Sequence, residues 1–115
     1  LKDGKTFAAL GTPGAARIVS TMTLLVSNLV DFGMGIQEAI EAPRFYARDT
    51  DADLSVEARV PARTTDALTK MGYRIKTLGD FDLFFGGAQG IVIDRKTGMR
   101  MGGADPRRDG AVAGY

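Results

Sequence analysis

Apolar and polar positions along this chain recur with the periods of a strand and of helices. Lys5–Leu10 follows a glycine turn and has the apolar content of a strand. From Ala15 to Phe32, apolar residues recur at helical spacing, and Arg17 is the only charge of that run before Asp31. A helix that is apolar on most sides is expected at the centre of a fold, covered by other elements.

Glycine and proline divide the rest of the chain into shorter elements. A second helix over Gly35–Ala42 ends before Pro43, and a third begins with Pro61 and runs to Met71. Four or five strands and three helices without internal repeats indicate an α+β fold. Several strands are very apolar for so short a chain, which indicates that further sheet is supplied from elsewhere. The other expected segments are the strands Leu54–Ala58, Tyr73–Leu78, Ala88–Asp94 and Met99–Gly103, an extended stretch at Arg44–Ala47 and a charged turn at Arg48–Asp53.

Composition narrows the chemistry that is available. The 115 residues are 44% hydrophobic and 25% charged, as in an ordinary globular chain. The net charge of +1, from 15 basic and 14 acidic residues, gives no reason to expect nucleic acid or an acidic membrane surface as a partner. Histidine and cysteine are absent, which excludes disulfides, Ser-His and Cys-His mechanisms, and metal sites built from those residues. We therefore expect neither a metal nor a cofactor.

Two features concern the chain as a whole. The longest apolar stretch, Ala15–Val30, is too short and too polar to span a bilayer. The first residue is Leu1 and not Met, so we expect a processed chain or a piece of a longer one. We therefore expect the 115 residues to form a single partial domain.

The loop Gly11–Ile18 is the candidate site. It joins the first strand to the long helix, so its backbone N–H groups are expected to converge on one point. Such a point suits a bound anion or a negative charge that develops during a reaction. Taken alone, the loop has a simpler interpretation as a plain strand-to-helix turn. Arg17, in the first helical turn, is interpreted as half of a structural salt bridge rather than as a substrate contact.

The remaining charged and aromatic residues that stand out in the sequence are expected to have structural rather than functional roles. Glu38 and Glu41, at i and i+3, are expected on a solvated face or beside Arg44. Asp105 with Arg107 is expected to pin the C-terminal loop rather than to bind a ligand. The phenylalanines of the loop Gly79–Gly87 are expected to be exposed: Phe81, Phe84 and Phe85. Gly86 and Gly87, beside Phe84 and Phe85, could line a pocket, but a turn before the next strand is the preferred interpretation.

Three segments, in order, resemble one enzyme family. Gly11–Ile18 is similar to the Gly-Ser-Pro-Gly-Gly-Ser-Arg-Ile segment of gamma-glutamyltranspeptidases. Asp31–Phe45 is similar to the next block of that family, and Gly103–Arg108, with the ending Ala113–Tyr115, is similar to its C-terminus. The order and spacing match over essentially the whole chain. By this resemblance the chain is the C-terminal part of a gamma-glutamyltransferase small subunit.

The resemblance implies a fold and a mechanism. The family has the four-layer α-β-β-α architecture of N-terminal nucleophile hydrolases, in which a precursor cleaves itself. A new N-terminal threonine is then the nucleophile, and its own amine can serve as the base, so no histidine is needed. That threonine, and the groups that hold the substrate's alpha-carboxylate, lie outside this chain. Gamma-glutamyl compounds such as glutathione are the implied substrates, for transfer or hydrolysis. The implied partners are the rest of the small subunit and the large subunit, and a periplasmic or secreted location is favoured.

One functional feature maps onto this sequence by resemblance. The family's Gly-Gly pair, whose backbone forms the oxyanion hole and contacts substrate there, falls on Gly14 and Ala15. Alanine retains the N–H group, and it is tolerated if the residue has a negative φ, as a first helical residue would. On the same reasoning, Ala15→Pro is expected to fold and to lose one donor. A second departure, Tyr46 after Phe45, carries no functional interpretation.

Alternatives remain open on the sequence alone. The chain could belong to another acylase on the same scaffold, either cephalosporin-acylase-like or poly-gamma-glutamate-processing. It could also be a non-catalytic anion-binding or assembly module that uses the same loop. A threonine after a cleavable junction upstream of Leu1 would discriminate in favour of the enzymes.

Overall fold

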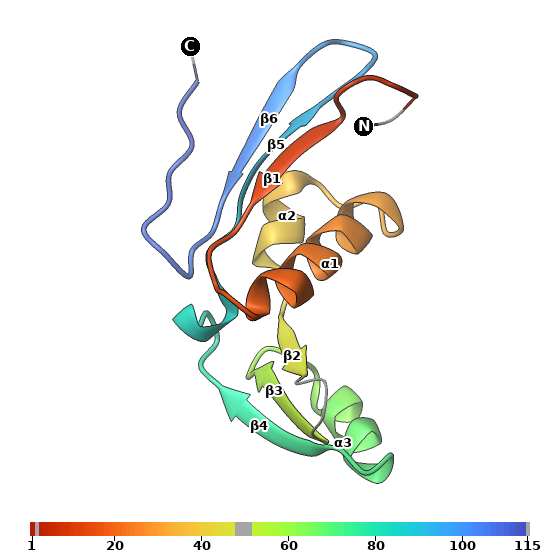
Figure 1. The fold of residues 1–115 in the computed structure, drawn as a ribbon, viewed down its shortest axis with the longest axis vertical. Helices are drawn as coiled ribbons and strands as arrows, with labels where there is room; N and C mark the ends of the chain where they lie inside the picture. The colour runs from red at the N-terminus through yellow and green to blue at the C-terminus, as the bar shows by residue number, and fades with distance from the viewer. Residues whose placement is uncertain (2, 48–51, 115) are drawn as a thin grey trace.

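The chain folds into two small lobes that lie along the long axis of a molecule measuring 46 × 30 × 25 Å (Figure 1). The computed structural model describes residues 1, 3–47 and 52–114. Most of the expected turn Arg48–Asp53 and the final Tyr115 therefore lie outside the described residues. The elements, in order, are β1 (Ala8–Gly11), α1 (Arg17–Val30), α2 (Ile36–Glu41), β2 (Phe45–Ala47), β3 (Asp53–Glu57), α3 (Ala62–Lys70), β4 (Arg74–Leu78), the 3-10 turn η1 (Leu83–Phe85), β5 (Gln89–Ile93) and β6 (Arg100–Ala104).

The first lobe joins the two ends of the chain in one sheet. Its strands are antiparallel in the order β1-β5-β6, with Ala9 opposite Ile91 and Gly90 opposite Gly103. Helices α1 and α2 cover one face of this sheet (Figure 1). The hydrophobic core lies between those helices and the sheet, and its buried members are Leu25, Leu29, Ile36, Ala39, Ile40, Ala88 and Val92.

The second lobe is built from the middle of the chain. Strands β2, β3 and β4 form a second three-stranded sheet, in which β2–β3 is antiparallel and β3–β4 is parallel. The parallel pair requires a crossover, which α3 supplies, as parallel neighbours always need. Leu54 and Val56 are the buried apolar side chains of β3, on alternate positions as its sequence pattern predicts. Glu57, the last residue of the strand, is buried as well.

Two helix starts differ from the sequence expectation. Helix α1 begins at Arg17 and not at Ala15, because the chain is still in a left-handed conformation at Ala15. Pro61 precedes α3 as its N-cap, with φ −57° and ψ 136°, instead of forming its first helical residue. Proline suits both positions, since its fixed φ is compatible with either and its missing N–H is not needed.

Two expectations about burial are also corrected. Helix α1 buries Leu25 and Leu29, but Val19 and Val30 on its other side are 72% and 63% exposed. Within the described residues this helix is therefore covered on one side only. The second correction concerns the phenylalanines that were expected to be exposed. Phe81 is exposed as expected, but Phe84 is half-buried and Phe85, against which it packs, is only 1% exposed.

Candidate functional site

The loop before α1 has an unusual backbone at the two positions of the candidate site. Gly14 has φ +147° and Ala15 has φ +50°. Both values lie in the region that favours glycine, and an L-residue with left-handed helical φ is less stable by about 1–2 kcal/mol. The condition set for alanine at this position, a negative φ, is therefore not met. Ala15 keeps its N–H group but holds it in a strained conformation, and proline, with φ near −65°, does not fit here.

The carbonyl groups of the loop point into the start of α1. The Arg17 N–H donates to the Gly14 carbonyl at 3.0 Å, and the Ile18 N–H donates to the Ala15 carbonyl at 3.0 Å. The N–H groups of Gly14 and Ala15 donate no hydrogen bond within the described part of the chain. Both residues precede Arg17, the first residue of α1, so their N–H groups take no part in the hydrogen bonds of the helix.

The N-terminus of α1 has no group of its own to neutralise these donors. No side chain caps the helix at Ala16, and the first turn contains no acidic residue. The helix dipole places partial positive charge at this end, and free N–H groups in such a place stabilise negative charge. Ala15 is exposed and Gly14 is half-buried, so the pair is accessible. The arrangement can therefore bind an anion or stabilise an oxyanion.

Arg17 does not form the salt bridge that its sequence position predicts. Within the described residues it has no ion pair, and its guanidinium carbon lies 4.5 Å from the centre of the Phe84 ring. Its Nε is buried and has no hydrogen-bond partner there. Cation–π contact stabilises a cation without adding an anion to the site. The positive end of α1 thus stays uncompensated.

A buried ionic network lies where the two lobes meet, next to this loop. Glu57 is fully buried and accepts bonds from the Arg107 guanidinium at 2.5 and 2.7 Å. Asp105 is also fully buried, and it pairs with Arg107 at 3.0 Å and with Arg44 at 2.7 Å. Two carboxylates and two guanidinium groups give a core that is neutral overall. Arg59, at the surface, adds a further contact to Glu57 at 2.8 Å.

The two central arginines respond differently to burial. Desolvation lowers the pKa of Arg44, and the nearby charge of Arg107 lowers it further against the opposing effect of Asp105. Desolvation also acts to lower the pKa of Arg107, but the hydrogen bonds and charges of Glu57 and Asp105 outweigh it, so that pKa is raised. Arginine stays protonated throughout the physiological range in both cases. Both guanidinium groups therefore keep their charge, and the hydrogen bonds that they donate stabilise the network.

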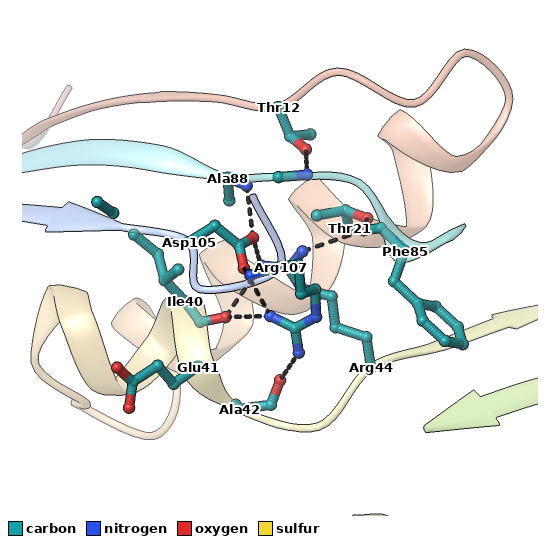
Figure 2. A network of polar contacts seen from close by, with 12 residues as sticks. Thr12, Thr21, Ile40, Glu41, Ala42, Arg44, Phe85, Ala88, Asp105 and Arg107 are labelled. Carbon is teal, nitrogen blue, oxygen red and sulfur yellow. Dashed lines mark hydrogen bonds and ion pairs between the residues drawn. The ribbon is translucent and has the colours of Figure 1, made fainter. Parts of the chain in front are cut away.

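The network also holds the segment that packs against the candidate loop. Figure 2 shows Asp105 directed at the backbone of Ala88, whose N–H it accepts at 2.6 Å, and Arg44 directed at the Phe85 carbonyl at 3.0 Å. The Phe85 carbonyl also accepts the hydroxyl of Thr21 from α1, at 3.0 Å. The C-terminal loop, the second lobe and α1 are thus fixed to one stretch of backbone.

The network was anticipated only in part. Asp105 and Arg107 do pin the C-terminal loop, as expected. Glu38 and Glu41 are exposed, but Arg44 pairs with Asp105 instead of either. The burial of Glu57 is not predicted by the sequence. The alternating pattern of its strand places Leu54 and Val56 on the buried face and Glu57 on the face expected to be exposed to solvent.

Among the described residues, no group of three or more acidic side chains is placed so that it could hold a metal ion. None of the described helices has the length and apolar character needed to cross a bilayer.

The chain matches known proteins along its whole length. A family model described as gamma-glutamyltranspeptidase matches residues 1–115. A glutathione hydrolase-like proenzyme of Bacillus subtilis is 36% identical over 117 residues, which cover 98% of this chain and 22% of that protein. A gamma-glutamyltranspeptidase variant of Helicobacter pylori aligns at a TM-score of 0.84 and 38% identity, covering 94% of this chain and 57% of that one. A cephalosporin acylase from Bacillus halodurans aligns at a TM-score of 0.92 and 31% identity, covering 99% of this chain and 21% of that one.

These matches fix the family and the fold. The chain spans 22% of the length of the Bacillus subtilis relative, so its relatives contain much that is not described here. The α+β class is confirmed, and the structural neighbours are N-terminal nucleophile hydrolases, as expected for a part of that four-layer fold. Because the family model covers every residue, the chain belongs to the gamma-glutamyltranspeptidase family.

Proposed function

We propose that this chain supplies the oxyanion hole of a gamma-glutamyltranspeptidase-family enzyme, through the backbone N–H groups of Gly14 and Ala15. The observation that carries the proposal is the pair of free N–H groups at an uncapped, uncompensated helix start. Attack of a nucleophile on an amide carbonyl converts its oxygen into an alkoxide. Two preorganised donors stabilise that charge, and loss of one donor typically slows such reactions by about 100- to 1,000-fold.

The nucleophile in this proposal is a threonine outside the chain, the first residue of the mature small subunit. It attacks the gamma-carbonyl of a gamma-glutamyl amide, and the amine leaves as the tetrahedral intermediate collapses. Water or an acceptor amine then attacks the acyl-enzyme through a second oxyanion. A relative is named as a glutathione hydrolase-like proenzyme, which supports gamma-glutamyl compounds as the substrate class. The chain alone, without the nucleophile, is expected to be inactive.

The proposal assigns residues 1–115 to the C-terminal portion of the small subunit, as one partial domain that is completed by other chain segments. Exposed apolar surface supports this assignment. Val19, Val26 and Val30 form an exposed stripe along α1, and they are 72%, 45% and 63% exposed. Among the described strands, β1 pairs only on its β5 side. We infer that the rest of the small subunit and the large subunit cover that stripe and extend the sheet at β1.

A second candidate function is an acylase on the same scaffold. The cephalosporin acylase of Bacillus halodurans aligns with a higher TM-score, 0.92, than the Helicobacter pylori enzyme, 0.84. The proposed oxyanion hole serves either reaction, since both pass through a tetrahedral alkoxide. Comparing kcat/KM of the mature enzyme on a gamma-glutamyl anilide and on a cephalosporin side-chain amide distinguishes the two functions.

The oxyanion hole is tested by removing one N–H group without changing any side chain. Proline at Ala15 is unsuitable because φ is +50° there. A backbone ester, with lactate in place of Ala15, deletes the N–H while keeping the side chain. We expect kcat of the mature enzyme to fall about 100- to 1,000-fold. A matched ester at Ala111, an exposed position outside the loop, is expected to leave kcat unchanged. Equal activity of the Ala15 ester and the unmodified enzyme would refute the proposal.

A further inference from the structure

The direction of a backbone N–H is set by the carbonyl of the same peptide group. The six atoms of a peptide group are planar, so the carbonyl of one residue and the N–H of the next point in opposite directions. The Gly14 N–H shares a plane with the Pro13 carbonyl, and the Ala15 N–H shares a plane with the Gly14 carbonyl. The Gly14 carbonyl is held by the Arg17 N–H, within the turn itself.

The Pro13 carbonyl is held by a side chain. The Thr12 hydroxyl donates to it at 3.0 Å. The same hydroxyl oxygen accepts the Gly87 N–H at 3.2 Å, across 75 positions of sequence. Figure 2 shows Thr12 pointing at the backbone just before Ala88, where the network of Asp105 is attached. A single hydroxyl therefore joins the peptide that carries one oxyanion donor to the anchored backbone before β5.

Gly86 lies close to the same peptide and to the Thr12 hydroxyl. It has φ +89°, and a Cβ at this position would lie 2.7 Å from the Pro13 carbonyl oxygen and 2.8 Å from the Thr12 hydroxyl. Any side chain would push both atoms away. The ring of Phe84, two positions earlier, lies against the Arg17 guanidinium, whose carbon is 4.5 Å from the ring centre. The stretch Phe84–Gly87 therefore contacts the chain both before and after the two donors.

From this geometry we infer that Thr12 and Gly86 are positioning residues of the oxyanion hole, with Thr12 orienting the Gly14 N–H through the Pro13–Gly14 peptide plane. The inference rests on the proposed function of Gly14 and Ala15. Thr12 does not touch the substrate in this scheme. Its hydroxyl fixes a direction, and its effect is greatest when the oxyanion forms.

The test compares variants of the mature enzyme that contains this chain. Thr12→Val keeps the shape of the side chain and removes the hydroxyl, whereas Thr12→Ser keeps the hydroxyl. Thr64→Val is the matched control, because Thr64 is exposed on α3 and its hydroxyl makes no hydrogen bond within the described residues. Rates are measured on a gamma-glutamyl anilide and normalised to the amount of processed enzyme. A boronate analogue of the gamma-glutamyl group measures the affinity for a tetrahedral, anionic adduct.

For Thr12→Val we expect kcat to fall by about 10- to 100-fold while KM changes less than about twofold, since a misdirected donor weakens the transition state more than the bound substrate. The inhibition constant of the boronate is expected to rise by the same factor as kcat falls. Thr12→Ser is expected to restore kcat to within about threefold, and Thr64→Val to leave it unchanged. A purely structural role would instead change the amount of folded enzyme without changing the kcat of the processed fraction.

A second variant covers the case in which Thr12→Val does not fold. A backbone ester at Gly87, with glycolate in place of glycine, removes the N–H that the Thr12 hydroxyl oxygen accepts and leaves every side chain unchanged. It is also expected to lower kcat. An unchanged kcat in the Thr12→Val enzyme, or in the Gly87 ester where the valine variant fails to fold, overturns the inference. If the Ala15 ester lowers kcat while these changes do not, only the positioning role fails. If the Ala15 ester also has no effect, the oxyanion hole itself is wrong.

Discussion

Ala15→Gly gives a direct measure of the strain in the candidate site. Ala15 has φ +50°, a conformation that is less stable for an L-residue by about 1–2 kcal/mol and that carries no such penalty for glycine. Glycine also makes the unfolded chain more flexible, which opposes the gain by about 0.4–1 kcal/mol. The Ala15 side chain is exposed, so little packing is lost. The net expectation is a stabilisation of about 0.5–1 kcal/mol.

The urea midpoint of unfolding is measured for the mature enzyme with and without the substitution. The slope of the transition is compared as well, because an equal slope shows that the change in midpoint reflects a change in stability. Ala67→Gly is the matched control. Ala67 is also exposed, but it lies in the middle of α3, where glycine is expected to destabilise by about 0.5–1 kcal/mol. The same substitution is thus expected to have opposite signs at the two positions. Because glycine keeps the N–H group, Ala15→Gly is also expected to keep kcat within about twofold. A loss of stability at Ala15 as large as that at Ala67 would contradict the assigned strain.

Two further predictions concern charged groups. Glu57→Gln leaves Arg107 with one carboxylate partner in a buried site, so we expect a destabilisation of about 3–5 kcal/mol in the same urea experiment. Asp3→Asn removes one partner of the exposed pair with Arg95 and should cost less than about 1 kcal/mol. Equal losses of stability in the two variants would show that burial does not strengthen the Glu57 pair. The pKa of Asp94 lies below its ordinary value because the Lys96 backbone N–H and the Thr97 hydroxyl donate hydrogen bonds to its carboxylate. The carboxylate therefore stabilises the fold at neutral pH, and this contribution is lost as the pH falls through the lowered folded-state pKa. Asp94→Asn should therefore be less stable than the wild type at pH 7, and the difference should shrink below about pH 4; a difference that stays constant with pH would contradict this.

The strand, loop and helix around the candidate site could be predicted because their signals are local. Apolar residues at helical spacing mark α1, and the glycines of the loop mark where β1 ends. The conformation of Ala15 could not be predicted in this way. Alanine is the strongest helix former, so its presence after Gly14 extends the apparent helix to include it. Its positive φ reflects how the whole loop is held, which local preference does not encode.

The buried network could not be predicted because its members meet only in three dimensions. Glu57 and Arg107 are 50 positions apart, and each, in its local segment, has the pattern of a solvent-exposed charge. The role of Thr12 is hidden in the same way. A threonine beside a proline fits any turn, and only the approach of Gly87, 75 positions later, gives its hydroxyl a specific partner.

The long separation between Thr12 and Gly87 also sets an order of events during synthesis. The ribosome synthesises the loop Gly11–Ile18 early. Strand β5, which pairs with β1, and Gly87, which donates to Thr12, are synthesised much later. Such distant contacts form slowly, because a long segment must first be closed into a ring. The N–H groups of Gly14 and Ala15 are therefore synthesised well before the contact between Thr12 and Gly87 can form. Chemistry at the proposed oxyanion hole must wait until the nascent chain extends past β5.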